Sequence, residues 1–421
     1  RGATPGGRTT MDMNLINRIP GALQGVVDAG DLSGFVTLIW RKGEIVQLNT
    51  LGRRDIAGDK PMTRDTMFRI ASMTKPLTSV LALMLMEEGQ LKLDDPITKW
   101  APEFSGMKVL KSASGPLDEV VDAPRDITVE DLLTHRSGLA YGFTSVGPIA
   151  RAHQEVLGPL FGNPHGPDQW MERLASLPLS YAPGERFHYS HATDVLGFLV
   201  GRVAGATYQD FLKAKILEPL GMTDTDFWCP PEKRDRMAKL YKAEDDAPLK
   251  DVSFVHEDHP PAFCAGGGGL ISTVDDYLTF ARLMLNRGEL NGVRLIREDT
   301  FDLMTSNRLT PEQRAIPFMG IPFWLGQGFG LGVSVITDPE KQAWMGAGST
   351  GAFGWPGAFG TWWQADPEED MILIYLIQNS MELGPESASQ VATGQRMGGR
   401  AALPIFQKQA YAALGKGPAL V

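Results

Sequence analysis

One stretch decides the fold: Phe68-Arg-Ile-Ala-Ser-Met-Thr-Lys-Pro-Leu-Thr-Ser-Val-Leu-Ala-Leu-Met-Leu-Met-Glu-Glu-Gly89. It places Ser72 and Lys75 three residues apart and then continues as an apolar run with only two polar residues between 77 and 86. Such a run predicts a helix that is buried on most of its circumference. It is much shorter than the roughly 20 residues that cross a bilayer. Pro76 is tolerated only in a first helical turn and Gly89 favours a helix end, so Ser72 is expected at the mouth of this helix.

A serine and a lysine one turn apart suit nucleophilic catalysis. A serine hydroxyl is a weak nucleophile until a neighbouring base takes its proton, and a lysine amine withdrawn from water can serve as that base. The N–H groups at the start of the helix favour a developing oxyanion. The spacing alone is weak, because Ser105 and Lys108 repeat it in a loop-like stretch with no long helix after it. The alternative is that Ser72 is an ordinary helix N-cap.

Size and composition bound the possibilities. A chain of 421 residues with 43% apolar residues can build a substantial core in roughly two or three domains. A net charge of −10 does not fit a nucleic-acid-binding surface and would be repelled by anionic lipid. Cys229 and Cys264 are expected to be free thiols, which favours a reducing compartment. Residues 1–10 read as a disordered extension or a cloning remnant without an apolar signal core, so we expect a cytoplasmic protein, with a removed leader as the open alternative.

Strand-like patterns lie near both ends of the chain. Residues 35–48 and 359–377 each read as a β-hairpin, with a helix expected before the first at 13–30 and one after the second at 401–414. This order predicts an α+β fold whose antiparallel sheet is built from both chain ends and flanked by helices. The chain is therefore expected to divide into a sheet-containing domain (11–95 and 255–421) and a mainly helical inserted domain (96–254).

From about residue 91 to residue 260, the sequence consists of many short segments separated by prolines and turn-forming residues, with few strand-like runs. Residues 168–178 and 192–217 carry helical periodicity, and Thr128 begins a helix with a pattern typical of a capping box. The glycine run 266–269 leads into another helix with Ser272 or Thr273 as its N-cap. That run lacks the Lys-Ser/Thr of a phosphate-binding loop, so nucleotide binding is not expected.

Two further features bear on catalysis. Tyr189 lies at the start of a helical run in Pro183–Gly197, and a phenol can act as a general base beside an ammonium group. The stretch Gly354-Trp-Pro-Gly-Ala-Phe-Gly-Thr-Trp362 brings small residues to the start of a strand, which allows the close backbone approach of an oxyanion hole. Taken singly, each has a structural alternative: Tyr189 as a core aromatic, and the glycine stretch as an ordinary turn.

Together these motifs resemble the serine β-lactamase and penicillin-binding-protein superfamily, and most closely the family VIII carboxylesterases. In chain order, Ser72-Met-Thr-Lys75 matches Ser-x-x-Lys, Tyr189-Ser-His191 matches Tyr-x-Asn, and Trp355-Pro-Gly357 matches Lys-Thr-Gly. The stretches 132–138 and 266–273 are also similar to framework segments of that family. Three elements in the right order are far more specific than any one of them.

The resemblance implies a fold like that of β-lactamases and transpeptidases, and a mechanism. Ser72 is expected to attack an ester carbonyl, with Lys75 and Tyr189 handling its proton, and water then releases the acyl group. The backbone N–H groups of Ser72 and Ala358 are implied as the oxyanion hole, and which of Lys75 and Tyr189 is the primary base stays open. No cofactor or metal is implied, and the close histidine pair His256 and His259 lacks a metal-binding pattern.

The departures from the family pattern shift the expected substrate. Trp355 stands where β-lactamases carry a lysine that helps to hold the substrate carboxylate, so we expect neutral, short-chain esters, with weak β-lactam hydrolysis as a further activity. Trp355 and Gly357 are expected to bind substrate. Pro356 has no backbone N–H donor and is not expected to bind substrate. His191 replaces the usual asparagine and is expected to contact either substrate or Lys75.

Several alternatives remain beside a carboxylesterase. A β-lactamase or a D-alanyl-D-alanine peptidase uses the same scaffold, and a non-catalytic binding protein on it is the alternative from another class. An α/β-hydrolase esterase is disfavoured, because no Gly-x-Ser-x-Gly occurs and the nearest sequence, Ala347–Gly351, lacks the flanking strand and helix of a nucleophile elbow. The expected partner is a small-molecule ester, with β-lactams as a further substrate class, and neither nucleic acid nor a membrane span is expected. The sequence does not determine the oligomeric state.

Overall fold

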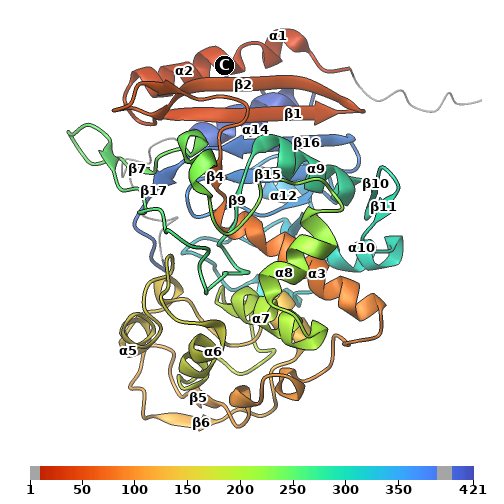
Figure 1. The fold of residues 1–421 in the computed structure, drawn as a ribbon. Helices are drawn as coiled ribbons and strands as arrows, with labels where there is room; N and C mark the ends of the chain where they lie inside the picture. Colours follow the sequence, from red (N-terminus) through yellow and green to blue (C-terminus); the bar gives the residue numbers. More distant parts are fainter. Residues whose placement is uncertain (1–9, 386–400) are drawn as a thin grey trace, which may run out of the picture.

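An eight-stranded antiparallel sheet forms the centre of the computed structural model, which describes residues 10–385 and 401–421 (Figure 1). The strand order is β12-β13-β14-β15-β16-β1-β2-β3. The strands are β1 (Gly34–Arg41), β2 (Glu44–Asp55), β3 (Lys60–Pro61), β12 (Gln327–Phe329), β13 (Ser334–Ile336), β14 (Phe353–Gly354), β15 (Trp362–Asp366) and β16 (Met371–Leu376). Since β1 pairs with β16, the first and last strand-forming segments meet in the middle of the sheet, which confirms the α+β fold built from both chain ends.

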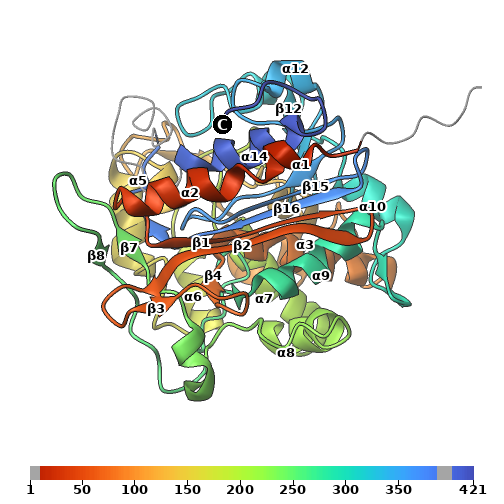
Figure 2. The same cartoon turned by 90° about the horizontal axis from the view of Figure 1, so that it is seen from above.

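Helices cover both faces of this sheet, so its central strands are apolar on both sides (Figures 1 and 2). On β1, Phe35 and Ile39 pack under the terminal helices, whereas Val36 and Leu38 face the main core. This alternation follows from the two-residue period of a strand. The helices on the terminal face are α1 (Met13–Ile16), α2 (Ile19–Asp28) and α14 (Leu403–Ala412), and those on the other face include α3 (Lys75–Glu87) and α9 (Val274–Leu285).

Two predicted helices are interrupted. The helix expected at 13–30 is divided into α1 and α2, because the chain turns at Asn17 and Arg18 and Pro20 takes an early position in the second helix. The helix expected at 192–217 ends at Ala204, where Gly205 adopts a φ of +70° as a left-handed C-cap. Helical structure then resumes at residue 208. Both breaks follow from the preference of proline for the first turn of a helix and of glycine for its end. The hydrophobic periodicity of the two segments continues across these positions and did not reveal them.

The middle of the chain is mainly helical, as predicted. Its α-helices are α4 (Val129–Leu133), α5 (Pro148–Ala152), α6 (Pro167–Ala175), α7 (Ala192–Ala204) and α8 (Tyr208–Leu212). It also has the short 3-10 helices η2 (Ile97–Lys99), η3 (Pro102–Phe104), η4 (Gly142–Thr144) and η7 (Pro231–Arg236), and the π-helical segments η5 (His153–Leu157) and η6 (Lys213–Leu217). It also holds the hairpin β5 (Lys108–Leu110) and β6 (Val120–Asp122). The buried helix α3 packs against α7 and so joins this region to the sheet.

Short elements complete the structure. They are β7 (Tyr241–Lys242), β8 (Lys250–Asp251), β17 (Asn379–Ser380), β4 (Phe68–Arg69), β9 (Ile271–Ser272), β10 (Glu289–Leu290), β11 (Val293–Arg294), η1 (Ala71–Thr74), α10 (Glu298–Met304), α11 (Pro311–Arg314) and α12 (Pro339–Gln342). Because β7 pairs with both β8 and β17, the end of the middle region is hydrogen-bonded to the C-terminal part, and the proposed domain boundary near 254 stays a prediction. No helix in residues 10–385 or 401–421 has the length and apolar character needed to cross a membrane.

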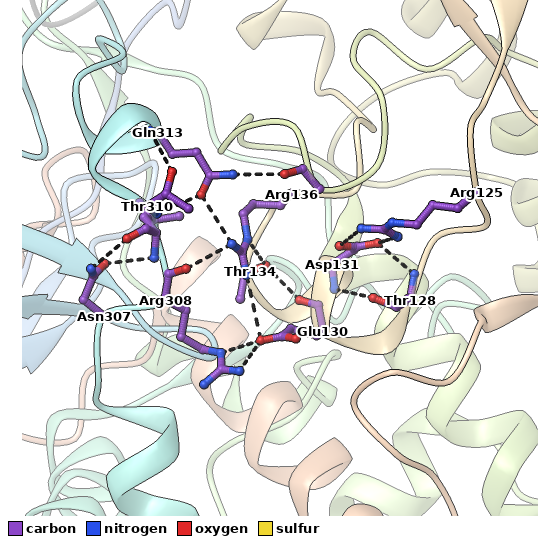
Figure 3. A network of polar contacts seen from close by, with 12 residues as sticks. Arg125, Thr128, Glu130, Asp131, Thr134, Arg136, Asn307, Arg308, Thr310 and Gln313 are labelled. Carbon is purple, nitrogen blue, oxygen red and sulfur yellow. Dashed lines mark hydrogen bonds and ion pairs between the residues drawn. The ribbon is translucent and has the colours of Figure 1, made fainter.

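A polar network fastens α4 to the segment that precedes and includes α11 (Figure 3). The Glu130 carboxylate accepts a hydrogen bond from Arg308 Nε at 2.5 Å and lies 3.8 Å from Arg136 Nη2. Arg136 also donates to the Arg308 carbonyl oxygen at 3.0 Å. In the same helix, Thr128 and Asp131 form the predicted capping box. The network therefore joins two segments that are more than 170 residues apart.

Removing the Glu130 carboxylate is expected to destabilise this junction. Glu130→Ala leaves the partly buried guanidinium groups of Arg308 and Arg136 without their shared carboxylate, at a cost of about 1–3 kcal/mol. Thermal unfolding monitored by circular dichroism should show a lower Tm than the wild type. Glu172→Ala, at an exposed position of α6, is the control and should leave the Tm nearly unchanged. Equal Tm values for the two variants would contradict a stabilising role for the network.

Candidate active site

Ser72 lies in the one-turn helix η1, directly before α3. Pro76 occupies the first turn of α3, as predicted. The helix begins at Lys75, directly after η1 ends at Thr74. Ala71 is fully buried and has a φ of +45°, a conformation that costs a non-glycine residue of order 1 kcal/mol. The packing around this turn therefore imposes the backbone conformation that presents Ser72.

The structure brings Ser72, Lys75 and Tyr189 together. Lys75 Nζ donates a hydrogen bond to Ser72 Oγ at 3.1 Å, and the Tyr189 hydroxyl donates to the same oxygen at 2.6 Å. Tyr189 comes from the segment just before α7, where Thr144 holds its carbonyl oxygen at 2.8 Å. One hydroxyl oxygen is thus contacted by an amine and a phenol from distant parts of the chain. Both groups are within direct proton-transfer distance of Ser72.

Lys75 is almost fully buried, with 1% of its surface exposed. Besides Ser72, its Nζ donates to the Tyr141 hydroxyl at 2.7 Å and to the Gly267 carbonyl oxygen at 2.5 Å. It also lies 4.6 Å from the centre of the Tyr189 ring. Within the described parts of the chain it forms no ion pair with a carboxylate. Neutral acceptors therefore fix the direction of the amine.

Tyr141 is a residue of this site that sequence reasoning missed. Burial raises the pKa of the Tyr141 phenol well above its ordinary value, and the nearby charge of Asp194 acts in the same direction. Tyr141 therefore stays protonated, and its hydroxyl oxygen accepts the hydrogen bond from Lys75. No pattern in the sequence marks it, because it follows the framework stretch 132–138 without a motif of its own. Tyr141 contacts Lys75 and makes no hydrogen bond with Ser72 Oγ, so its role in this site is to position Lys75.

Trp355, which is expected to bind substrate, makes a polar contact with the catalytic tyrosine candidate. Its indole Nε1 donates a hydrogen bond to the Tyr189 hydroxyl oxygen at 2.9 Å. The ring also belongs to a buried aromatic cluster with Tyr141, Phe187 and Tyr189. Trp355 thus orients the phenol and supplies a donor that would stabilise negative charge on its oxygen.

Gly357 and Ala358 lie against the turn that carries Ser72. A Cβ added at Gly357 would approach the Ile70 carbonyl oxygen to 2.5 Å, so only glycine permits this contact between the two segments. Ala358 lines the same cavity as Ser72. This placement fits the predicted oxyanion hole made by the backbone N–H groups of Ser72 and Ala358, whose role stays a prediction.

His191 reaches Lys75 only through other groups. Its Nδ1 is 2.8 Å from Asp194 Oδ2, while Asp194 Oδ1 accepts a hydrogen bond from the Gly267 backbone N–H at 2.8 Å. The carbonyl of Gly267 in turn accepts from Lys75. Sequence reasoning missed Asp194 and the role of Gly267, although both lie in stretches that it singled out. The expected direct contact between His191 and Lys75 is not among the contacts of the described residues.

Ser72 opens into a small cavity. Its volume is about 30 Å³, which by this measure holds one or two water molecules. A wider hollow of about 710 Å³ continues from it and shares Phe143, Leu160, Phe161 and Ala358 with the smaller one. His191 lines this wider part, and its role in substrate binding stays a prediction.

The described residues contain no cluster of three or more histidine, cysteine or acidic side chains arranged to hold a metal ion. His135 is buried against the Tyr189 ring at 4.9 Å between ring centres. Burial, reinforced by the charge of Lys75, lowers the pKa of His135 well below its ordinary value. It is therefore a neutral packing partner of Tyr189.

Comparison with known proteins identifies relatives over nearly the whole chain. A family model described as Beta-lactamase matches residues 20–390. Protein Rv1367c of Mycobacterium tuberculosis is 48% identical over 397 residues, which cover 94% of this chain and 98% of that protein. Esterase EstB of Burkholderia gladioli is 30% identical over 372 residues, covering 83% of this chain and 87% of its own length. The solved structure of EstCE1, titled a hydrolase with promiscuous acyltransferase activity, superimposes with a TM-score of 0.75 at 24% identity, covering 96% of this chain and 98% of that one.

Proposed function

The chain belongs to the beta-lactamase family of serine hydrolases, and from that membership we propose that it is a carboxylesterase acting on neutral, short-chain esters through an acyl-enzyme. The observation that carries the proposal is the convergence of Lys75 and Tyr189 on Ser72 Oγ, with Trp355 in place of the lysine of the third family motif. The 30% identity to an esterase over most of both chains supports the same reaction class.

In the first half of the reaction, Ser72 Oγ attacks the ester carbonyl carbon. Its proton passes to the Lys75–Tyr189 pair, and the carbonyl oxygen becomes an oxyanion that the backbone N–H groups of Ser72 and Ala358 would stabilise. When the tetrahedral intermediate collapses, the pair returns the proton to the leaving alkoxide, which departs as an alcohol. Ser72 then carries the acyl group as an ester.

In the second half, water attacks the acyl carbon. The same pair takes a proton from the water and gives it back to Ser72 Oγ as the acid is released. Trp355 supports both halves, because its indole N–H stabilises the Tyr189 oxygen whenever that oxygen bears negative charge. At the start of each half, one member of the pair has to accept a proton.

Three features favour an ester over a β-lactam substrate. Trp355 provides no cation where the family pattern has one, and the residues that line the cavity at Ser72 include neither arginine nor lysine. The buried cluster beside it is aromatic, with Phe187, Trp324 and Phe329 around Trp355. A β-lactam carboxylate would therefore be desolvated there without an ionic partner. A non-catalytic binding protein is disfavoured, because it would have no need of the complete Ser72–Lys75–Tyr189 contact set.

Parallel assays with p-nitrophenyl butyrate and nitrocefin test this assignment. We expect kcat/KM for the butyrate ester to exceed that for nitrocefin by about 100-fold or more, since a buried unpaired carboxylate carries a large penalty. A series of p-nitrophenyl esters from acetate to laurate should show its maximum among the short acyl chains. A preference for nitrocefin would replace the esterase by the β-lactamase assignment. Release of D-alanine from a D-alanyl-D-alanine peptide, without ester turnover, would replace it by the peptidase.

A further inference from the structure

Arg69 is a partly buried cation that the proposed chemistry does not use. It lies three residues before Ser72, at the end of β4, which pairs with β9. The Gln378 side chain fixes its backbone on both sides: the Arg69 N–H donates to Gln378 Oε1 at 3.1 Å, and Gln378 Nε2 donates to the Arg69 carbonyl oxygen at 2.9 Å. The position of this arginine is thus tied to the turn that carries the nucleophile.

The guanidinium of Arg69 has no anionic partner in residues 10–385 and 401–421. Its contact is the face of the Phe254 ring, 5.3 Å from the ring centre. Burial lowers the pKa of Arg69 and outweighs the opposing effects of Cys229 and Glu257. Arg54, Arg64 and Arg236, which are near it in the sequence or in space, each pair with an aspartate. Since buried charges in proteins are ordinarily paired, an unpaired guanidinium facing a cavity is a site for an external anion.

Arg69 lines two adjoining cavities of about 100 Å³ and 440 Å³. Arg234 lines the larger one and donates only to carbonyl oxygens, those of Cys229 at 3.1 Å and Glu257 at 2.6 Å. Burial lowers the pKa of His256 between them, and the positive charges of Arg69, Arg234 and Lys239 lower it further. The local field is therefore positive although the whole chain carries a charge of −10.

The acidic groups around these cavities do not neutralise Arg69. They are Asp55, Asp235 and Glu257. Asp235 pairs with Lys60 and Arg54, and Asp55 accepts the Gly58 backbone N–H at 3.0 Å. Glu257 is exposed and forms no ion pair with Arg69. An anion that enters the smaller cavity would thus meet a cation with its hydrogen-bonding capacity unused.

The cavity at Ser72 and the smaller cavity at Arg69 adjoin each other. The cavity at Ser72 and the smaller cavity at Arg69 share Leu160, Phe161, Ala265 and Gly268. Phe161 packs against Phe359 at 4.9 Å and against Phe254 at 5.6 Å between ring centres. Since Phe254 stacks on Arg69, aromatic surface extends from the nucleophile to the guanidinium. A molecule that spans both cavities needs an apolar middle and an anionic end.

We propose that Arg69 binds a carboxylate at the far end of the ester substrate, whose apolar chain lies along Phe161, Phe254 and Phe359 while its ester carbonyl reaches Ser72. This assignment rests on the proposed esterase function and extends its substrate class from neutral esters to esters with a remote carboxylate. The anionic group is recognised by a guanidinium beside β4 instead of at the Trp355 position. The carboxylate can belong to the acyl chain or to the alcohol, and the two give different test substrates.

Mono-p-nitrophenyl esters of dicarboxylic acids, from adipic to sebacic acid, test the acyl-chain arrangement against their methyl-capped neutral analogues. At low salt and at the best chain length, the wild type is expected to hydrolyse the free-acid ester with a kcat/KM about tenfold higher than that for the methyl-capped ester. In Arg69→Met, the ratio of these two kcat/KM values should fall to about one. Arg69→Lys should restore part of it, because charge returns without the bidentate geometry. Arg64→Met, at an exposed arginine paired with Asp275, is the matched control and should keep the wild-type ratio. Butyrate esters of ω-hydroxy acids, followed by pH-stat, test the alcohol arrangement in the same way.

A binding measurement separates this proposal from the esterase assignment. Titration of suberate into the Ser72→Ala protein by calorimetry should show binding that Arg69→Met weakens about tenfold in the same background. If the wild type hydrolyses no ester at all, the esterase function fails, and suberate binding still decides the role of Arg69. The proposal would be overturned if Arg69→Met kept both the wild-type ratio of acid to capped-ester kcat/KM and the wild-type suberate affinity, even if that variant has a lower Tm. In that case Arg69 serves packing against Phe254 alone.

Discussion

Replacing Ser72 by Ala is expected to abolish ester turnover, with kcat/KM for p-nitrophenyl butyrate falling by about 10⁴-fold or more. The reason is that, among residues 10–385 and 401–421, Ser72 Oγ is the one atom that accepts hydrogen bonds from both Lys75 Nζ and the Tyr189 hydroxyl. Without it, the two groups have no oxygen to deprotonate and no acyl-enzyme forms. Mass spectrometry of the protein mixed with substrate and quenched early should show an added butyryl group in the wild type and none in the variant.

Ser105 offers a matched control for this experiment. Ser105 and Lys108 repeat the Ser-x-x-Lys spacing, but Ser105 is exposed at the end of η3 and far from the cavity lining. Ser105→Ala should therefore retain wild-type kcat/KM and the butyryl adduct. Full activity in Ser72→Ala would end the proposed mechanism, because no other residue could then be assigned as the nucleophile on these contacts.

Replacing Tyr189 by Phe is expected to lower kcat by about 10²–10⁴-fold with little change in KM. The substitution keeps the ring in its aromatic cluster and removes only the hydroxyl that contacts Ser72 Oγ at 2.6 Å. It also leaves the Trp355 indole N–H without its acceptor. Proton transfer to the leaving alkoxide should suffer most, so steady-state kinetics with esters of increasingly basic alcohols should show a growing defect.

Tyr181 serves as the comparison for this second variant. Its ring lies over the Arg186 guanidinium and it does not line the cavity at Ser72, so Tyr181→Phe should keep the wild-type kcat. An undiminished kcat in Tyr189→Phe would assign the proton transfer to Lys75 alone. A loss confined to KM would instead make Tyr189 a substrate-binding residue. The pair of variants thus tests which member of the Lys75–Tyr189 pair the reaction requires.

The elements that follow from local pattern were predictable. The buried helix after Ser72, the hairpins that become β1–β2 and β15–β16, and the Thr273 N-cap of α9 all follow from periodicity, turn residues and capping rules within a short stretch. The sheet built from both chain ends followed from the order of those elements. Local pattern marked Tyr189 and the Gly354–Trp362 stretch only as candidates with structural alternatives, and the family resemblance then gave Tyr189 and Trp355 their expected roles.

The sequence by itself determined the nucleophile motif, the sheet-forming segments and the family, because each depends on residues that are close in the chain or on motifs in a fixed order. Only the tertiary structure decided that Tyr141 and the Gly267 carbonyl hold Lys75, that Trp355 donates to Tyr189, and that no carboxylate of residues 10–385 or 401–421 forms an ion pair with Arg69. Each of these depends on contacts between segments at least 65 residues apart or on the absence of a partner. Burial and hydrogen-bond pairing are properties of the packed molecule, so composition and spacing do not encode them in readable form.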